Sequence, residues 1–132
     1  MMVICPYCSH PAKSATGADI YPHLPEIAHK QFYRCQPCNA WVGCHDGTDK
    51  PLGRLADAEL RMAKRQCHAL FDPLWKRRMV ISDCKKQVAR GLGYAWLARE
   101  LGIDAKDCHI GMFDLPTCRR VIAICAPYAR PS

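Results

Sequence analysis

CPYC at residues 5–8 and CQPC at residues 35–38 are two Cys-x-x-Cys pairs with 26 residues between them. A two-residue gap lets both sulfurs of a pair reach one ion, and a tetrahedral Zn²⁺ takes four such ligands. A closed shell of four thiolates leaves no open coordination position, so this metal is expected to fold the chain and not to catalyse. We therefore predict one structural Zn²⁺, with four ligands: Cys5, Cys8, Cys35 and Cys38.

Other ligand sets compete with this one. A thioredoxin-like redox pair explains one of the motifs but not both. Cys44 or His45 replaces one of the four ligands in a second alternative, although both follow strand-like residues and form no Cys-x-x-Cys turn. A further, open metal site is conceivable because a His–Asp pair four residues apart shares one helix face. No hydrolase or nuclease signature accompanies its candidates, which are His45, His68, Asp72 and His109.

Short strands and a loop are expected around the second cysteine pair. Gln31–Arg34 and Ala40–Gly43 are apolar and aromatic stretches of strand length. Residues 43–53 are rich in Gly, Asp and Pro and are expected to form a loop. Residues 1–53 are therefore predicted to be a zinc ribbon.

From Arg54 onward the apolar pattern becomes helical. Apolar residues recur at spacings of three and four from Ala56 to Phe71, as on the buried stripe of an amphipathic helix. Asp72-Pro73 is expected to end this helix, because the residue before a proline resists the α conformation.

Two more helices are expected in the C-terminal half. Ser82 or Asp83 can cap a helix that runs to about Leu101, where Gly102 suits the left-handed position beyond its end. Asp114 can cap the next helix. We predict an α+β fold in which the ribbon packs against about three helices, residues 54–132, in one compact unit.

Ten cysteines in 132 residues allow two interpretations. A disulfide framework is typical of secreted chains. Met1–Ile4 is too short for the apolar part of a signal peptide, and no run reaches the ~18 apolar residues that span a membrane. A cytoplasmic protein is therefore expected, with metal-bound cysteines and buried single thiols, among them Cys67, Cys118 and Cys125.

The positive charge lies in the middle of the chain. The net charge is +7 overall; residues 54–90 hold ten Lys and Arg against four Asp and Glu, whereas residues 1–53 hold four of each. Such a field favours polyanions, although a solvated helix face explains the charges equally well. Arg61, Lys64, Arg65 and His68 are predicted to form a basic stripe opposite the buried face of the first helix. The candidate nucleic-acid-binding residues are Arg61, Lys64, Arg65, Lys76, Arg77, Arg78, Lys85 and Lys86.

Aromatic residues beside the cysteine pairs are a second candidate surface. Tyr7, Tyr33 and Trp41 can stack on bases if exposed, or form the core of the ribbon if buried. Trp75 and Trp96 are expected in the helical core.

The two cysteine pairs, GCHDGTDKPLG at 43–53, FDPLW at 71–75, WLARELGI at 96–103 and CHIGMFD at 108–114 resemble the zinc-finger-containing domain of phage and prophage proteins. The resemblance covers nearly the whole chain and implies the same four zinc ligands. Ser9 stands after the first pair where glycine is more usual. This family of uncharacterised function implies a phage setting, and hence the cytoplasm of a bacterial host, but no activity.

These features predict a zinc-binding, nucleic-acid-binding regulatory phage protein without catalysis. The alternatives are a protein-binding modulator of a host factor and, third, a metal-dependent nuclease. The expected partner is DNA, RNA or an acidic host protein, with no membrane and no small-molecule substrate. WLARELGI also resembles the first helix of a helix-turn-helix, which requires a second helix after a turn of three or four residues.

Overall fold

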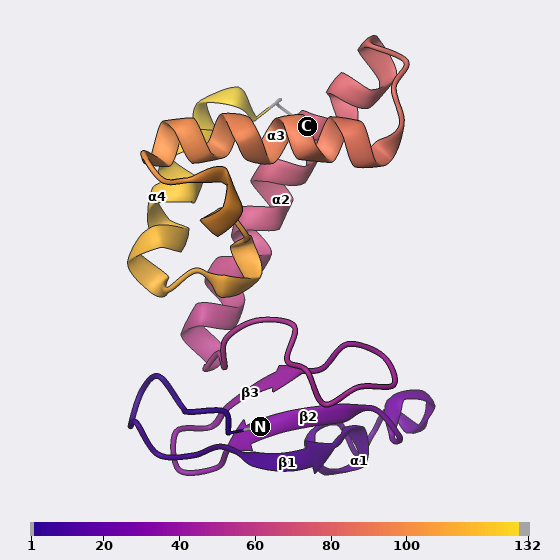
Figure 1. Cartoon of the computed structure of the whole chain (residues 1–132), viewed down its shortest axis with the longest axis vertical. Helices are drawn as coiled ribbons and strands as arrows, with labels where there is room; N and C mark the ends of the chain where they lie inside the picture. Colours follow the sequence, from indigo (N-terminus) through magenta and orange to yellow (C-terminus); the bar gives the residue numbers. More distant parts are fainter. Residues whose placement is uncertain (1, 130–132) are drawn as a thin grey trace. The chain divides into compact units, whose positions relative to one another are not determined.

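A computed structural model describes residues 2–129 and divides the chain into two compact units. We call Met1–Glu59 the ribbon unit and Leu60–Ser132 the helical unit (Figure 1). The first unit extends six residues beyond the predicted end of the ribbon. The reason is a backbone pairing in which Ala56 and Trp41 exchange two hydrogen bonds of 3.1 and 3.2 Å.

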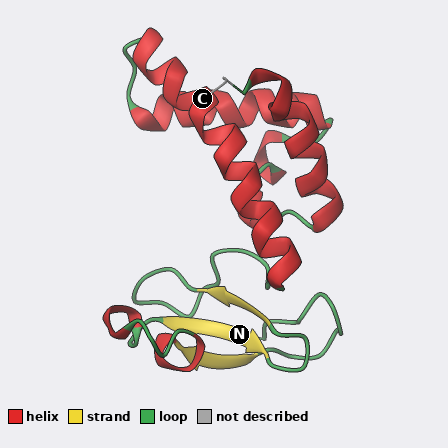
Figure 2. Cartoon of the chain, turned by 180° about the vertical axis from the view of Figure 1, so that it is seen from behind, coloured by secondary structure: helices red, strands yellow, loops and turns green. Residues whose placement is uncertain are grey.

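The ribbon unit contains a three-stranded antiparallel sheet in the order β1-β2-β3. Its strands are drawn in yellow in Figure 2. Both predicted strands are confirmed, as β2 (Gln31–Cys35) and β3 (Ala40–Gly43). β1 (Lys13–Thr16) was not predicted, because its sequence KSAT has no run of β-branched or aromatic residues. Its strand conformation comes from its pairing with β2, in which Ala15 lies opposite Phe32.

A short helical connection links β1 to β2. It consists of α1 (Gly17–Ile20) and the 3₁₀ turn η1 (Pro25–Ile27). Gly17 donates a 2.8 Å backbone hydrogen bond to Lys30, and a β-carbon at this position would collide with the carbonyl oxygen of Ile27. Glycine is therefore required where the connection folds back on itself.

The three predicted helices follow in the described residues. They are α2 (Ala58–Ile81), α3 (Lys86–Leu101) and α4 (Leu115–Cys125). All but the first two residues of α2 belong to the helical unit. The 3₁₀ turns η2 (Ala105–Asp107) and η3 (Ile110–Met112) separate α3 from α4, and η4 (Ala126–Tyr128) follows α4. This long connection excludes the helix-turn-helix interpretation. Within residues 2–129, no helix combines the length and the apolar character that a membrane span requires.

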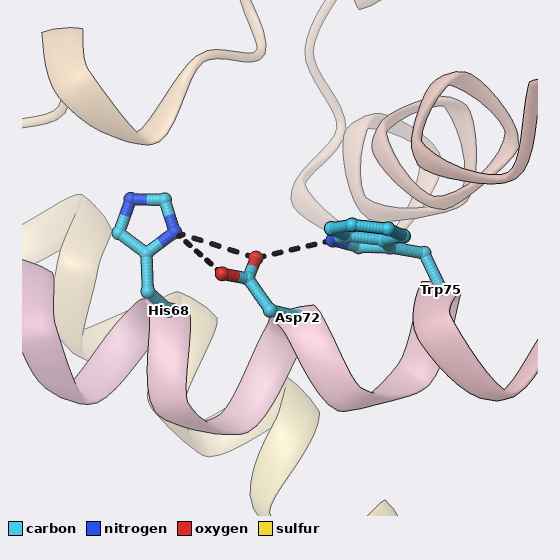
Figure 3. Close-up of polar contacts among 3 residues, drawn as sticks. All are labelled: His68, Asp72 and Trp75. Carbon is cyan, nitrogen blue, oxygen red and sulfur yellow. Dashed lines mark hydrogen bonds and ion pairs between the residues drawn. The ribbon is translucent and has the colours of Figure 1, made fainter. Parts of the chain in front are cut away.

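The prediction that Asp72-Pro73 ends the first helix is wrong. Pro73 lies inside α2, which continues for eight residues to Ile81. A proline costs a helix interior about 3 kcal/mol. Burial offsets this cost, because Phe71 and Trp75 on either side of the proline are 0% and 4% exposed. Asp72 also accepts a 3.1 Å hydrogen bond from the Trp75 indole (Figure 3).

The N-terminal end of α3 was predicted wrongly, and its C-terminal end was predicted correctly. Asp83 has a φ of 47° and is not the N-cap; Lys85 holds that position instead. The C-terminal prediction is confirmed: Gly102 has a φ of 74°, and Ile103 and Gly102 donate backbone hydrogen bonds to Ala98 and Arg99. This pattern is a Schellman end.

The Asp114 cap of α4 is also confirmed, because its side chain accepts a 3.0 Å hydrogen bond from the Thr117 amide.

In the helical unit α3 crosses α2 (Figure 1), and buried side chains of α2 meet α3 at the crossing. A β-carbon on Gly93 would lie 3.0 Å from Cβ of Trp75 and 3.3 Å from Cζ of Phe71, so glycine permits the close crossing. Trp75 belongs to the core as predicted, whereas Trp96 is half-buried and does not. The predicted burial of three thiols is confirmed; all are 0% exposed: Cys67, Cys118 and Cys125.

Candidate metal centre

Four cysteine sulfurs meet at one point in the ribbon unit. The Sγ atoms of Cys5, Cys8, Cys35 and Cys38 all lie within 4.8 Å of one another. The Cys8 and Cys35 sulfurs are 3.7 Å apart. Zn–S bonds of about 2.3 Å in a tetrahedron require sulfurs about 3.8 Å apart, so this donor set fits Zn²⁺. These residues hold one structural Zn²⁺ and leave no position open for a substrate.

The first cysteine pair lies in a tight turn. The Cys5 amide donates a 2.8 Å hydrogen bond to the His10 carbonyl, and the Ser9 amide donates one of 2.8 Å to the Cys5 carbonyl. Ser9 closes the turn with a φ of 65°, the left-handed conformation that glycine adopts most easily. Serine therefore keeps the turn at some conformational cost.

The second pair lies in the hairpin between β2 and β3. Cys35 ends β2 and faces Ala40 at the start of β3. Within the hairpin the Asn39 amide donates a 3.0 Å hydrogen bond to the Gln36 carbonyl, and Asn39 has a φ of 52°. Asparagine tolerates this left-handed conformation well. The sheet thus places two sulfurs against the first turn.

The metal site is part of the ribbon core. Cys5 and Cys35 are buried together with Tyr33, Ala40 and Leu55. A core this small depends on the metal for stability, because few apolar side chains are available to bury.

The environment of the sulfurs separates their pKa values. Hydrogen bonding from the backbone and then the side chain of His10 lowers the pKa of Cys8 to about 6. Hydrogen bonding to Cys8, followed by burial, raises the pKa of Cys38 to about 12. Ionisation of one sulfur therefore opposes ionisation of its neighbour unless a cation balances both charges. His10 was not predicted as a neighbour of the site, and its position two residues after Cys8 was the available signal.

The alternative ligands lie elsewhere. Cys44 forms an isolated bridge with Pro51 in the loop after β3. Among the described residues, the four-cysteine cluster is the only group of three or more His, Cys, Asp or Glu side chains that can hold a metal. His68 and Asp72 do pair across one turn of α2, at 3.3 Å, but they gather no third ligand (Figure 3). His45 and His109 join no such group either.

The predicted basic stripe does not lie opposite the buried face of α2. Arg61 and Lys64 directly follow the buried Leu60 and Ala63 and are themselves half-buried. Adjacent helix residues are about 100° apart, so this stripe lies on the flank of the core. Lys64 Nζ donates a 2.7 Å hydrogen bond to the carbonyl oxygen of Gly111. Lys64 is therefore engaged within the helical unit.

The other predicted cations fall into two groups. Arg77 donates a 3.1 Å hydrogen bond to the Tyr128 carbonyl, and Lys76 lies 5.7 Å from the centroid of the Trp75 ring. The remaining four are exposed, and within residues 2–129 their side chains make no hydrogen bond or ion pair: Arg65, Arg78, Lys85 and Lys86.

The aromatic residues of the ribbon unit offer little stacking surface. Tyr33 is buried in the core, and the Trp41 indole donates a 3.0 Å hydrogen bond to the Tyr21 hydroxyl. Tyr7 is more exposed, but its hydroxyl accepts a 3.1 Å hydrogen bond from the Asp57 amide. All three therefore contact other residues of the ribbon unit, and Tyr7 is the most exposed of them.

Comparison with known proteins identifies the family. Neither the curated proteins nor the solved structures contain a match to this chain. A family model described as a zinc-finger-containing domain matches residues 1–128, which include all four cysteine ligands. The chain therefore belongs to the zinc-finger-containing domain family.

Proposed function

We propose that the protein binds nucleic acid through its helical unit and acts without catalysis as a phage or prophage regulatory protein in the bacterial cytoplasm. The observation that carries this proposal is the separation of charge between the two units. Residues 60–132 hold fourteen Lys and Arg against six Asp and Glu, a net charge of +8. Residues 1–59 hold five against six, a net charge of −1. Four thiolates with one Zn²⁺ make the ribbon unit more negative by two.

Charge at this density favours a polyanion, because each cation that contacts a phosphate releases condensed counterions. Arg65, Arg78, Lys85 and Lys86 are suited to such contacts, since all four are exposed and have no partner within the described residues. The structural zinc has a different role: it folds the ribbon unit and has no open coordination position for chemistry.

The start of α3 adds a local argument. Lys85 is its N-cap and Lys86 its first residue, and the first turn contains no acidic side chain. Cations at the positive end of a helix dipole are unfavourable by about 0.3–1 kcal/mol. The same arrangement attracts an anion, because the free backbone amides of the first turn also point toward it. A locally unfavourable pair of lysines is thus consistent with phosphate binding.

The test is a salt titration of binding with matched double variants. We expect the protein to bind DNA or RNA oligonucleotides at ~50 mM salt. The logarithm of its affinity should fall linearly with the logarithm of the salt concentration. Lys85→Ala/Lys86→Ala should flatten the slope on duplex DNA by up to about 1.8, because each lost phosphate contact contributes about 0.9. Lys13→Ala/Lys50→Ala removes the same charge from the ribbon unit and should leave the slope unchanged. No binding to either nucleic acid at ~50 mM salt would refute the proposal.

A second candidate function is binding to a host protein. Val80 and Ile81, at the end of α2, are 77% and 76% exposed. Adjacent exposed apolar side chains are typical of protein contacts. A complex recovered from host lysate that survives nuclease digestion, and is lost in Val80→Ser/Ile81→Ser, would support this candidate.

A further inference from the structure

We infer that a pocket between α2 and α3 receives one base of a single-stranded nucleic acid. This inference rests on the proposed function and names the form of nucleic acid that the helical unit prefers. The pocket has a volume of about 310 Å³ and lies entirely within the helical unit. Six of its lining residues carry the argument: Trp75, Arg78, Gly93, Trp96, Arg99 and Tyr128.

The floor of the pocket is aromatic and closely packed. Trp75 is 4% exposed, and its indole N–H is held by a 3.1 Å hydrogen bond to Asp72 (Figure 3). A β-carbon on Gly93 would crowd Cβ of Trp75 and the ring of Phe71, so glycine lets α3 lie close against this floor. Because Trp75 and Phe71 are almost fully buried, they close the bottom of the pocket, and a base must stack on the more exposed rings of its wall.

The wall of the pocket presents two more rings. Trp96 is half-buried, and Tyr128 is 54% exposed. Their centroids are 5.6 Å apart, and their planes meet at 87°. The backbone of Tyr128 is held in place by Arg77, which donates a 3.1 Å hydrogen bond to its carbonyl oxygen. An exposed ring that is fixed in position can stack on a base without a large loss of side-chain entropy.

Two arginine residues line the pocket. Arg78 and Arg99 are exposed, and within residues 2–129 neither side chain makes a hydrogen bond or ion pair. Among residues 2–129, no acidic side chain lines the pocket. Arginines in this position can bind the phosphates on either side of an inserted base, since a guanidinium offers five donors in a planar fork.

The combination favours a nucleobase over an apolar peptide side chain. Every base has a π-face that stacks on aromatic rings. The sugar-phosphate backbone of the strand supplies phosphates that Arg78 and Arg99 can bind. The volume lies at the lower end of the range for ligand pockets, about 300–1,000 Å³, and so suits one base rather than a large segment. Bases in a duplex are already stacked on one another, so the pocket selects single strands.

The experiment compares single-stranded and duplex oligonucleotides of equal length on the full chain loaded with zinc. We expect the single strand to bind more tightly and to quench tryptophan fluorescence. Tyr128→Ala should weaken single-strand binding by about 5- to 100-fold and leave duplex binding unchanged, because one stacking contact is lost. Tyr128→Phe keeps the ring and should bind as the wild type does. Arg99→Ala should weaken single-strand binding more than Lys106→Ala, which removes one exposed cation outside the pocket.

The outcomes separate the pocket from the proposed function. Equal affinity for single strand and duplex, with no effect of Tyr128→Ala, would overturn the pocket and leave nucleic-acid binding intact. An oligonucleotide with abasic sites that binds and quenches as well as the intact strand would also overturn it. Binding of an acidic, leucine-containing peptide without binding of any oligonucleotide would overturn both. Thermal unfolding of each variant checks that the fold is retained.

Discussion

Lys64 Nζ lies 2.7 Å from the carbonyl oxygen of Gly111 and joins the N-terminal third of α2 to η3. Hydrogen bonds from a charged donor contribute about 1.5–3 kcal/mol. We therefore predict that Lys64→Ala lowers the free energy of unfolding of the helical unit by about 1–3 kcal/mol, measured by denaturant unfolding followed by circular dichroism at 222 nm.

Arg65→Ala is the matched control for this prediction. Arg65 is the next residue along α2, but it is exposed and makes no contact of this kind within the described residues. Its removal should change stability by less than about 0.5 kcal/mol. If the two variants unfold alike, the Lys64–Gly111 hydrogen bond contributes nothing to the fold.

The metal centre yields a second prediction, on stoichiometry and stability. Elemental analysis of the purified protein should give one zinc per chain. Cys35→Ser removes a buried ligand at the end of β2 and should unfold the ribbon unit, because structural zinc contributes on the order of 10 kcal/mol to small folds. Cys44→Ser, outside the cluster, should retain both the zinc and the fold. A Cys35→Ser protein that melts as the wild type does, or two zinc ions per chain, would contradict the assignment.

The zinc site and the helices were predictable because their signals are local. A Cys-x-x-Cys pair lies in one turn, and Gly102 and Asp114 act on residues within one helical turn of themselves. β1 was not predictable in the same way, because KSAT becomes a strand only through its pairing with β2. Strand propensity depends on neighbours that a single sequence does not reveal.

Tertiary packing also explains why two predictions about α2 were wrong. Pro73 is a helix breaker locally, yet burial of Phe71 and Trp75 stabilises a helix that continues through it. The side chain of Lys64 was expected to face solvent, but the partner that holds it, Gly111, lies 47 residues further along the chain. No periodicity within α2 could indicate that contact. The pocket at Arg99 and Tyr128 was missed for the same reason, since it joins three separate segments.

Ser9 provides a third prediction. It closes the first cysteine turn with a φ of 65°, a conformation that costs a residue with a β-carbon roughly 1–2 kcal/mol. Ser9→Gly should therefore slow zinc loss to a chelator and raise the melting temperature of the ribbon unit. Asn39→Gly is the control at the corresponding position of the second turn, where φ is 52°. Asparagine already tolerates this region, so the control should gain less. Destabilisation by Ser9→Gly would show that the serine side chain has a role beyond the turn.

The buried thiols of the helical unit give the last prediction, on pH. Burial raises the pKa of Cys125 from its ordinary 9.0 to about 11, and a hydrogen bond with Cys118, followed by burial, raises that of Cys67. Below pH 9 these thiols are protonated in both the folded and the unfolded chain, so their contribution to stability is complete. Between about pH 9 and 11 the unfolded chain loses protons that the folded chain retains, so the free energy of unfolding must fall as pH rises. The limiting slope for one thiol is about 1.4 kcal/mol per pH unit.

Denaturant unfolding at a series of pH values from 7 to ~11 measures this slope, and Cys125→Ala is the control because it removes one titrating group. The variant should be less stable at pH 7, because it leaves a small cavity, yet should lose stability more slowly above pH 9. Identical pH dependence in the two proteins would show that Cys125 does not retain its proton in the folded state.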